Sequence, residues 1–292
     1  MREFPPVGED QVTLANWRNA PFSSWAFSHV REIIQTADIP NNPQDVWELH
    51  SELADLADLA VDDALNLNGY LDATYTDAFL VVHHGKIIAE DYRNAAGARI
   101  PHILMSVSKS MLGALSGILA DKGILDTAAP VSDYVPEIAG TAWKGASVQN
   151  LLDMRAGIGF DEDYEATSGA IIEYRKSTGW NPPEPGDSPS DLRSFFNQMS
   201  DTDGPHMGRF HYVSPNTDLM AWIIERATGA RFADLMSQHL WQPMGAETSA
   251  YITVDRLGAP RAAGGMCVTL RDLARVGLLM SNDGKRGTQQ VL

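Results

Sequence analysis

The sequence ILMSVSKSMLGALSGILADKG occupies residues 103–123 and contains the pattern on which the rest of the interpretation depends. Apolar residues recur on more than one face of a helix from Ile103 to Lys122, and Gly123 is typical of a residue that ends a helix. We therefore expect a buried helix at 103–122. Ser106 and Lys109 lie near its start, three positions apart, so the hydroxyl and the amine share one face.

Ser106 and Lys109 form an SxxK pattern that predicts nucleophilic catalysis if the lysine loses its charge. An amine buried among apolar side chains has a lowered pKa, so Lys109 could accept the proton of Ser106. Free N–H groups in the first helical turn could stabilise an oxyanion. On its own, however, the spacing favours a helix-capping serine beside a lysine that extends to solvent.

A second motif, YVSPNTD, occupies residues 212–218 and leads into a predicted helix at 217–228, which Gly229 ends. A phenol at Tyr212 could act as a general base or acid if Lys109 stabilised its anion. Most tyrosines are simply core residues, so the motif gains its interest from Ser106 and Lys109.

The rest of the chain gives one hairpin pattern and several helix patterns, so its middle is expected to be mostly helical. Two β-rich runs at 78–82 and 86–89 flank His83–Gly85 and predict a hairpin, with the histidines as turn residues. Four prolines at 179–191 predict an exposed loop, and residues 1–24 an N-terminal arm. Further helices are expected at 25–37, 46–60, 147–154 and 232–240, and from Thr269, where Asp272 completes a capping box.

Composition excludes several classes of protein. With 22 basic and 38 acidic residues the net charge is −16, which disfavours binding to nucleic acid or to an anionic membrane. No apolar run reaches the roughly 18 residues of a membrane span, and Met1–Asp10 does not resemble a secretory signal, so we expect a cytoplasmic protein. Cys267 is the only cysteine, which excludes an internal disulfide, and we expect it to be buried.

Five blocks of the sequence together resemble the 6-aminohexanoate-dimer hydrolases, the nylon-oligomer branch of the serine β-lactamase and penicillin-recognising family. The resemblance extends from about Trp17 to Leu292 and is far more specific than SxxK alone. The blocks are YTDAFLVV at 75–82, LMSVSKS at 104–110, LDMRAGIGFDEDY at 152–164, Gly179–Trp180 and FHYVSPNTD at 210–218.

The resemblance implies an α/β (α+β) fold of the β-lactamase/DD-peptidase type. An antiparallel sheet flanked by helices would include the hairpin, and the active site would lie between it and a mostly helical domain. We expect residues 1–105 to form the N-terminal part of the α/β domain, 106–264 the mostly helical domain with both motifs, and 265–292 an incomplete return to the α/β domain.

The resemblance also implies roles for single residues. Ser106 would be the nucleophile, Lys109 and Tyr212 its proton-transfer partners, and Tyr164 and Trp180 would face the substrate. The reaction would be two-step acyl transfer from a small amide or ester, with no metal or cofactor. Neither nucleic acid nor a membrane would be a partner, and a homodimer is left open.

Some positions depart from the family pattern. Ser214 stands where the wider family usually has Asn, which disfavours a β-lactam substrate; Asn216 is a candidate to replace that substrate contact. Arg175 stands where the best dimer-cleaving relatives can carry an acid, and its cation would repel a substrate ammonium. The acidic run Asp161–Asp163 could compensate near Tyr164, although such a run is more often a solvated loop.

The third motif of the family, a KTG or His-Gly strand, has no counterpart. Lys285–Thr288 has the wrong residue order and is expected to be a turn. We therefore expect a C-terminally truncated chain that lacks sheet strands and one oxyanion donor. Three hypotheses follow: a serine hydrolase of short amides or esters, a β-lactamase or DD-carboxypeptidase, or an inactive fragment or non-catalytic interaction module.

Overall fold

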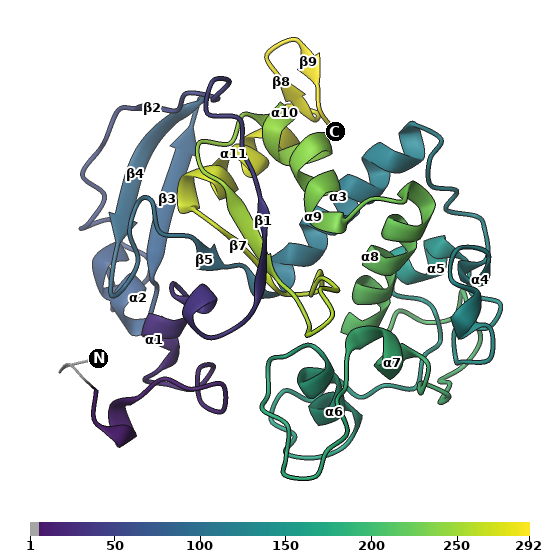
Figure 1. Cartoon of the computed structure of the whole chain (residues 1–292). Helices are drawn as coiled ribbons and strands as arrows, with labels where there is room; N and C mark the ends of the chain where they lie inside the picture. The colour runs from purple at the N-terminus through teal and green to yellow at the C-terminus, as the bar shows by residue number, and fades with distance from the viewer. Residues whose placement is uncertain (1–5) are drawn as a thin grey trace.

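The computed structural model describes residues 6–292, so the first five residues of the expected arm lie outside the described residues. Figure 1 shows the strands gathered on one side, helices α4 (Val131–Tyr134) to α8 (Ser214–Thr228) on the other, and α3 (Ser108–Asp121) between them. The molecule therefore has a sheet part and a helical part that meet along α3.

The main sheet has four antiparallel strands in the order β1-β6-β7-β5. The register places Ile103 opposite Cys267, which is fully buried as expected. One strand, β6, lies within 106–264, the block expected to be mostly helical. The strands are β1 (Thr36–Ile39), β5 (His102–Ile103), β6 (Ala250–Thr253) and β7 (Met266–Val268).

The predicted hairpin is confirmed as β3 (Ala78–His83) and β4 (Lys86–Tyr92). His84 and Gly85 form its turn with φ of 49° and 75°, a left-handed geometry that glycine adopts without strain. The hairpin belongs to a separate sheet in the order β2-β4-β3, in which β2 (His50–Ser51) is parallel to β4.

A third, two-stranded sheet overlaps the segment expected to be only a turn. Lys285–Arg286 forms β8, which pairs with β9 (Gln289–Gln290). The turn is therefore confined to Gly287 and Thr288.

Three helix ends lie where capping residues in the sequence predicted them. Ser147 caps α5 (Val148–Leu152), Gly229 ends α8 in a left-handed conformation, and Thr269 caps α11 (Leu270–Ser281), all as expected. The other helices are α1 (Ser23–Ala26), α2 (Leu67–Ala73), α6 (Ala170–Ser177), α7 (Leu192–Phe196), α9 (Phe232–Met236) and α10 (Gln242–Met244).

The helix predicted at 25–37 is wrong in most of its length. The chain forms only α1 and a 3₁₀ turn at Val30–Glu32 before Thr36 enters β1. Pairing of β1 with β6, more than 200 residues away, replaces the helix because it buries Ala37 and Ile39 in the sheet.

The helix predicted at 46–60 is absent, and α2 forms later, after the N-cap Asn66. Asp55 and Asp62 instead accept hydrogen bonds from backbone N–H groups two or three residues further along the chain. Such bonds stabilise turns in competition with a helix.

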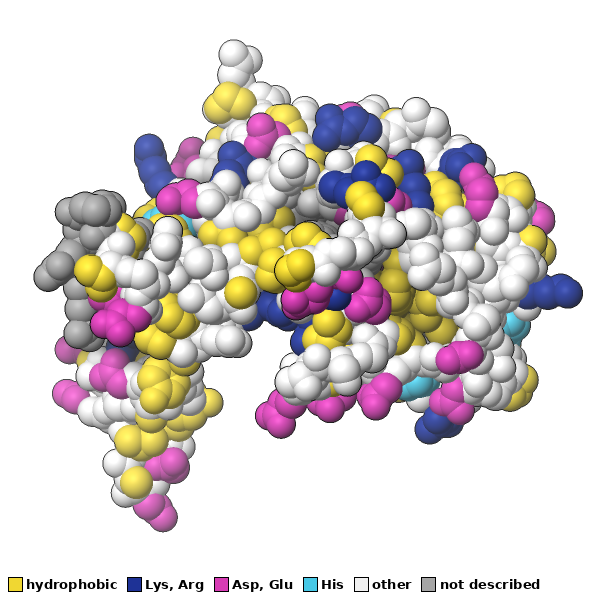
Figure 2. Space-filling view, turned by 60° about the horizontal axis from the view of Figure 1, so that its bottom comes forward, with side chains coloured by type: hydrophobic (Ala, Val, Ile, Leu, Met, Phe, Trp, Pro, Cys, Tyr) yellow, Lys and Arg dark blue, Asp and Glu magenta, His cyan; other side chains and the backbone are white. Residues whose placement is uncertain are grey.

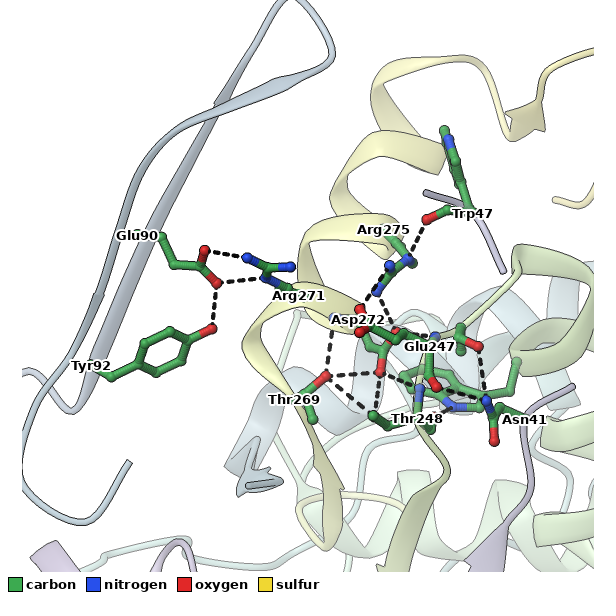
Figure 3. A network of polar contacts seen from close by, with 12 residues as sticks. Asn41, Trp47, Glu90, Tyr92, Glu247, Thr248, Thr269, Arg271, Asp272 and Arg275 are labelled. Atoms are coloured by element: carbon green, nitrogen blue, oxygen red, sulfur yellow. Dashed lines mark hydrogen bonds and ion pairs between the residues drawn. The ribbon is translucent and has the colours of Figure 1, made fainter. Parts of the chain in front are cut away.

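Helix α11 is fixed to the rest of the fold through one buried carboxylate. Asp272 is fully buried and accepts hydrogen bonds from the hydroxyls of Thr248 and Thr269 and from the guanidinium of Arg275 (Figure 3). Arg275 is 1 % exposed and also donates to the carbonyl of Trp47. This network joins α11, the segment before β6 and the segment before β2.

Replacing this carboxylate is expected to destabilise the fold strongly. In Asp272→Ala the guanidinium of Arg275 loses its fully buried carboxylate partner while it stays buried, so the free energy of unfolding should fall by about 3–5 kcal/mol. Urea unfolding followed by tryptophan fluorescence measures the change. Glu52→Ala, which removes an exposed partner of Lys86, is the control and should cost less than about 1 kcal/mol. Equal losses in the two variants would contradict the role of Asp272.

Candidate active site

Ser106 lies at the junction between β5 and α3. The predicted helix does not begin at Ile103: strand β5 is followed by a 3₁₀ turn, η3 (Met105–Val107), and α3 starts at Ser108. Pairing of β5 with β7 takes the first residues into the sheet. Met105 has a φ of 46°, which costs a non-glycine residue about 1–3 kcal/mol and is typical of functional sites. The strained turn leaves Ser106 exposed.

The structure brings Ser106, Lys109 and Tyr212 together. The Oγ of Ser106 lies 3.1 Å from Lys109 Nζ and 2.8 Å from Tyr212 Oη, and both groups donate hydrogen bonds to it. Lys109 Nζ also lies 4.7 Å from the centre of the Tyr212 ring. A hydroxyl, an amine and a phenol therefore form one continuous polar cluster.

Lys109 is held in place by a backbone carbonyl. Its ammonium donates to the carbonyl oxygen of Ala263, at 2.7 Å, in addition to Ser106. Burial and the nearby guanidinium of Arg261 lower the pKa of Lys109 from 10.5 to about 8. About a tenth of the amine is therefore neutral at pH 7 and able to accept a proton.

The pKa of Tyr212 favours the protonated form of its side chain, in contrast to the pKa of Lys109. It lies two residues before α8, and its pKa is raised, mainly by burial and also by the charge of Glu162, while the hydrogen bond to Ser106 lowers it. The phenol therefore keeps its proton at neutral pH. Of the two groups that contact Ser106, Lys109 is the better proton acceptor and Tyr212 the better donor.

A buried ion pair supports the backbone beside Lys109. Asp218, on α8, accepts hydrogen bonds from the guanidinium of Arg261 and from the hydroxyl of Tyr174. Its other oxygen accepts from the N–H of Ala263 at 2.7 Å. Asp218 thereby fixes the residue whose carbonyl orients Lys109.

The sequence did not assign these supporting residues to the site. Asp218 is the last residue of the second motif, but nothing in the motif indicates its role. Arg261 belongs to no motif. The available signal was that both are charged residues within apolar surroundings, since buried charges require partners.

The reactive cluster opens into a pocket of about 460 Å³ between the helical part and the sheet part. Figure 2 shows this hollowed face, with acidic and basic side chains gathered side by side near its centre. Fifteen residues line the pocket, including the predicted Ser106, Tyr164, Trp180 and Ser214 and also Arg18, Arg175 and Glu162.

Tyr164 and Trp180 differ in their freedom to meet a ligand. Tyr164 is 63 % exposed and donates a hydrogen bond to Glu162 at 3.0 Å. Trp180 is buried, donates from its indole nitrogen to Thr253, and packs edge-on against Trp17. Trp180 therefore forms a rigid wall of the pocket, and Tyr164 lies at its rim.

Ser214 and Glu162 form a second polar pair in the pocket. The hydroxyl and the backbone N–H of Ser214 donate to the two carboxylate oxygens of Glu162, at 2.5 and 2.6 Å. In the acidic run 161–163, Glu162 is thus partly buried and bonded, whereas Asp161 and Asp163 are exposed. The expectation of a solvated loop is wrong for Glu162.

The structure does not bring Asn216 into the pocket. This side chain is 1 % exposed, and its oxygen accepts a hydrogen bond from the indole nitrogen of Trp143 at 2.8 Å. Its contacts lie inside the helical part, away from Ser106. The amide that the wider family uses has no replacement at this position.

Two searches of the described residues bear on other site types. Residues 6–292 hold no group of three or more potential metal ligands from His, Cys, Asp and Glu. Within the same range, every helix is too short or too polar to span a bilayer.

Comparison with known proteins gives the same family from sequence and structure. Residues 70–292 match the family model described as Beta-lactamase. The chain is 39% identical over 282 residues to the 6-aminohexanoate-dimer hydrolase of Paenarthrobacter ureafaciens, a match that covers 96% of this chain and 70% of that protein.

Comparison with solved structures points to the same family. A Bacillus anthracis protein named as a candidate 6-aminohexanoate-dimer hydrolase superposes with a TM-score of 0.91 at 29% identity, covering 97% of this chain and 75% of that one. The octameric penicillin-binding protein homologue of Pyrococcus abyssi matches with a TM-score of 0.58 at 17% identity, over 76% of this chain and 55% of its own, and shows the fold alone. The predicted fold class is confirmed.

The lowered pKa of Lys109 is directly measurable. In protein labelled at the ε-carbon of lysine, the NMR signal of Lys109 is expected to titrate near pH 8. Lys176 is the internal control, because its hydrogen bond to Asp187 raises its pKa above the usual value. Lys109→Ala assigns the signal, and titration of Lys109 above pH 10 would contradict the description of the site.

Proposed function

The chain belongs to the β-lactamase family and is a serine hydrolase, and from this premise we propose that Ser106 is the nucleophile that cleaves small amides or esters through an acyl-enzyme. The observation that carries the proposal is the position of Lys109 and Tyr212, each within 3.1 Å of Ser106 Oγ. A base within hydrogen-bond reach of a hydroxyl is the arrangement that activates a serine nucleophile.

Acylation begins with proton transfer to the neutral amine of Lys109. Ser106 Oγ then attacks the substrate carbonyl carbon and forms a tetrahedral intermediate. As the intermediate collapses, Tyr212 donates its proton to the leaving nitrogen or oxygen, and the ammonium of Lys109 returns a proton to Tyr212. The result is an ester on Ser106, a released amine or alcohol, and Lys109 neutral again.

Deacylation reverses these transfers with water as the nucleophile. Water gives one proton through Tyr212 to Lys109 while its oxygen attacks the acyl carbon, and the proton then returns to Ser106 Oγ as the acid leaves. The carbonyl of Ala263 keeps Lys109 near both partners throughout, and Asp218 keeps Ala263 in place.

Linear substrates fit this pocket better than β-lactams. Ser214, at the place of the family asparagine, donates its hydroxyl hydrogen to Glu162 and therefore has no donor left for the carbonyl of a substrate amide. The Paenarthrobacter relative is named for a linear amide dimer. We therefore propose linear amides and esters as substrates, in preference to a β-lactamase or carboxypeptidase activity.

Single substitutions test the assignments through hydrolysis of p-nitrophenyl butyrate. Ser106→Ala should lower kcat/KM by about 1000-fold or more, since the covalent route is lost. Tyr212→Phe should lower it by about 100- to 10,000-fold, because the ring stays and only the proton donor is lost. Ser110→Ala changes an exposed hydroxyl on the same helix and is the matched control.

The outcomes separate the hypotheses. Full activity in Ser106→Ala would exclude the proposed nucleophile. Absence of turnover in the unmutated chain, with p-nitrophenyl butyrate, an aminohexanoate dimer and nitrocefin alike, would favour the interaction module instead.

The pH profile tests the identity of the base. Because only neutral Lys109 accepts the proton, kcat/KM should rise as the pH increases through about 8 and level off above it. The affinity of the Ser106→Ala protein for a ligand should not show the same increase with pH. A profile that is flat between pH 6 and 9 would contradict Lys109 as the base.

A further inference from the structure

The pocket beside Ser106 contains three guanidinium groups. Arg18 comes from the N-terminal segment, Arg175 from α6 and Arg261 from the segment between β6 and β7. These segments are far apart in the sequence and meet only at the pocket. The protein as a whole carries a net charge of −16, so this cluster of cations is a local reversal of its charge.

Only one of the three has a carboxylate partner among residues 6–292. Arg261 pairs with the buried Asp218. Arg18 donates to the amide oxygen of Asn181 at 2.5 Å, and Arg175 donates to the backbone carbonyl of Tyr164 at 3.0 Å. Neither of these acceptors is charged, so within residues 6–292 neither Arg18 nor Arg175 forms a direct ion pair.

The neighbouring residue Lys176 shows the contrast within one helix. It follows Arg175 on α6, forms ion pairs with Glu173 and Asp187, and does not line this pocket. The helix thus directs a neutralised cation away from Ser106 and an unneutralised one toward it.

Neighbouring guanidinium groups destabilise the charges of Arg18 and Arg175, whereas the pKa of Arg261 is raised by its partner Asp218. The pKa of Arg18 is lowered to about 10, first by burial and then by Arg175 and Arg261, and the pKa of Arg175 is lowered by burial and by Arg261. Glu162 and Asp163 oppose the effect on Arg175, but Glu162 already accepts hydrogen bonds from Ser214 and Tyr164. An anion that entered the pocket would relieve this repulsion.

We propose that Arg18 and Arg175 form a binding site for a carboxylate at the far end of the substrate's acyl group. Guanidinium groups bind carboxylates through paired, charge-assisted hydrogen bonds, and both side chains are partly buried, where such bonds are strongest. The preferred substrates are then half-amides and half-esters of dicarboxylic acids. This inference rests on the proposed function for the position of the acyl group.

The position of Tyr212 determines which part of the substrate enters the pocket. Tyr212 contacts Ser106 but does not line the pocket, whereas Arg18, Arg175 and Ser106 do. The leaving group must lie on the side of its proton donor. The acyl group therefore extends from Ser106 into the space that the arginines line.

Ligand binding without turnover tests the anion site by itself. In the Ser106→Ala protein, hexanoate is expected to raise the unfolding temperature, whereas hexylammonium and hexanamide, of similar length, should not. Arg18→Gln and Arg175→Gln, each added to Ser106→Ala, should weaken hexanoate binding by about tenfold. Lys176→Gln is the matched control and should leave it unchanged.

Kinetics test the effect on specificity. The mono-p-nitrophenyl esters of succinate, glutarate and adipate are compared with p-nitrophenyl butyrate. At least one half-ester should exceed butyrate in kcat/KM by about tenfold, and Arg18→Gln or Arg175→Gln should bring the ratio of the two kcat/KM values close to one. Arg175→Asp should shift the preference toward p-nitrophenyl 6-aminohexanoate, which carries an ammonium.

The two proposals fail in different ways. If hexanoate does not bind better than hexanamide, or binds equally well after both arginine substitutions, the carboxylate site is refuted, whatever the catalytic result. If hexanoate binds as expected but no ester is cleaved in a Ser106-dependent manner, the anion site stands and the proposed function fails.

Discussion

The buried carboxylate of Asp218 holds together the parts of the molecule that form the reactive cluster. It joins α8, which follows Tyr212, to the segment before β7, which contains Ala263. Through Ala263 it also positions Lys109, which belongs to α3. Lys109 and Tyr212, the two groups that contact Ser106 Oγ, thus both depend on the position of one side chain that lies outside this cluster.

An ion pair of this kind is costly to bury, and its presence is informative for that reason. Desolvation of Asp218 and Arg261 offsets much of their attraction, and well-packed apolar residues often replace such pairs without loss of stability. An apolar pair could not, however, accept the N–H of Ala263, and it would lack the charge of Arg261, which lowers the pKa of Lys109 against the opposite effect of Asp218. The pair is therefore better explained by its effect on Lys109 than by stability.

The sequence predicted what depends on local signals. Ser147, Gly229 and Thr269 mark the helix ends where the structure has them, because caps act within one turn. The pairing of Ser106 with Lys109 followed from helical spacing, and Tyr212 joined them through the family resemblance. What failed depends on distant contacts: β1 replaced a predicted helix because β6 lies beside it, and Ser106 left the helix because β5 pairs with β7.

The arginines of the pocket show why charge counted along a sequence is a poor guide to a site. Arg175 was interpreted as one unfavourable cation in an acidic chain, since nothing in the sequence places Arg18 or Arg261 beside it. The fold brings all three to one pocket. Screening in water reduces the influence of the distant surface acids, whereas charges a few ångströms apart in a partly buried pocket interact strongly. The local balance, and not the net charge of −16, should therefore decide which substrate end the pocket accepts.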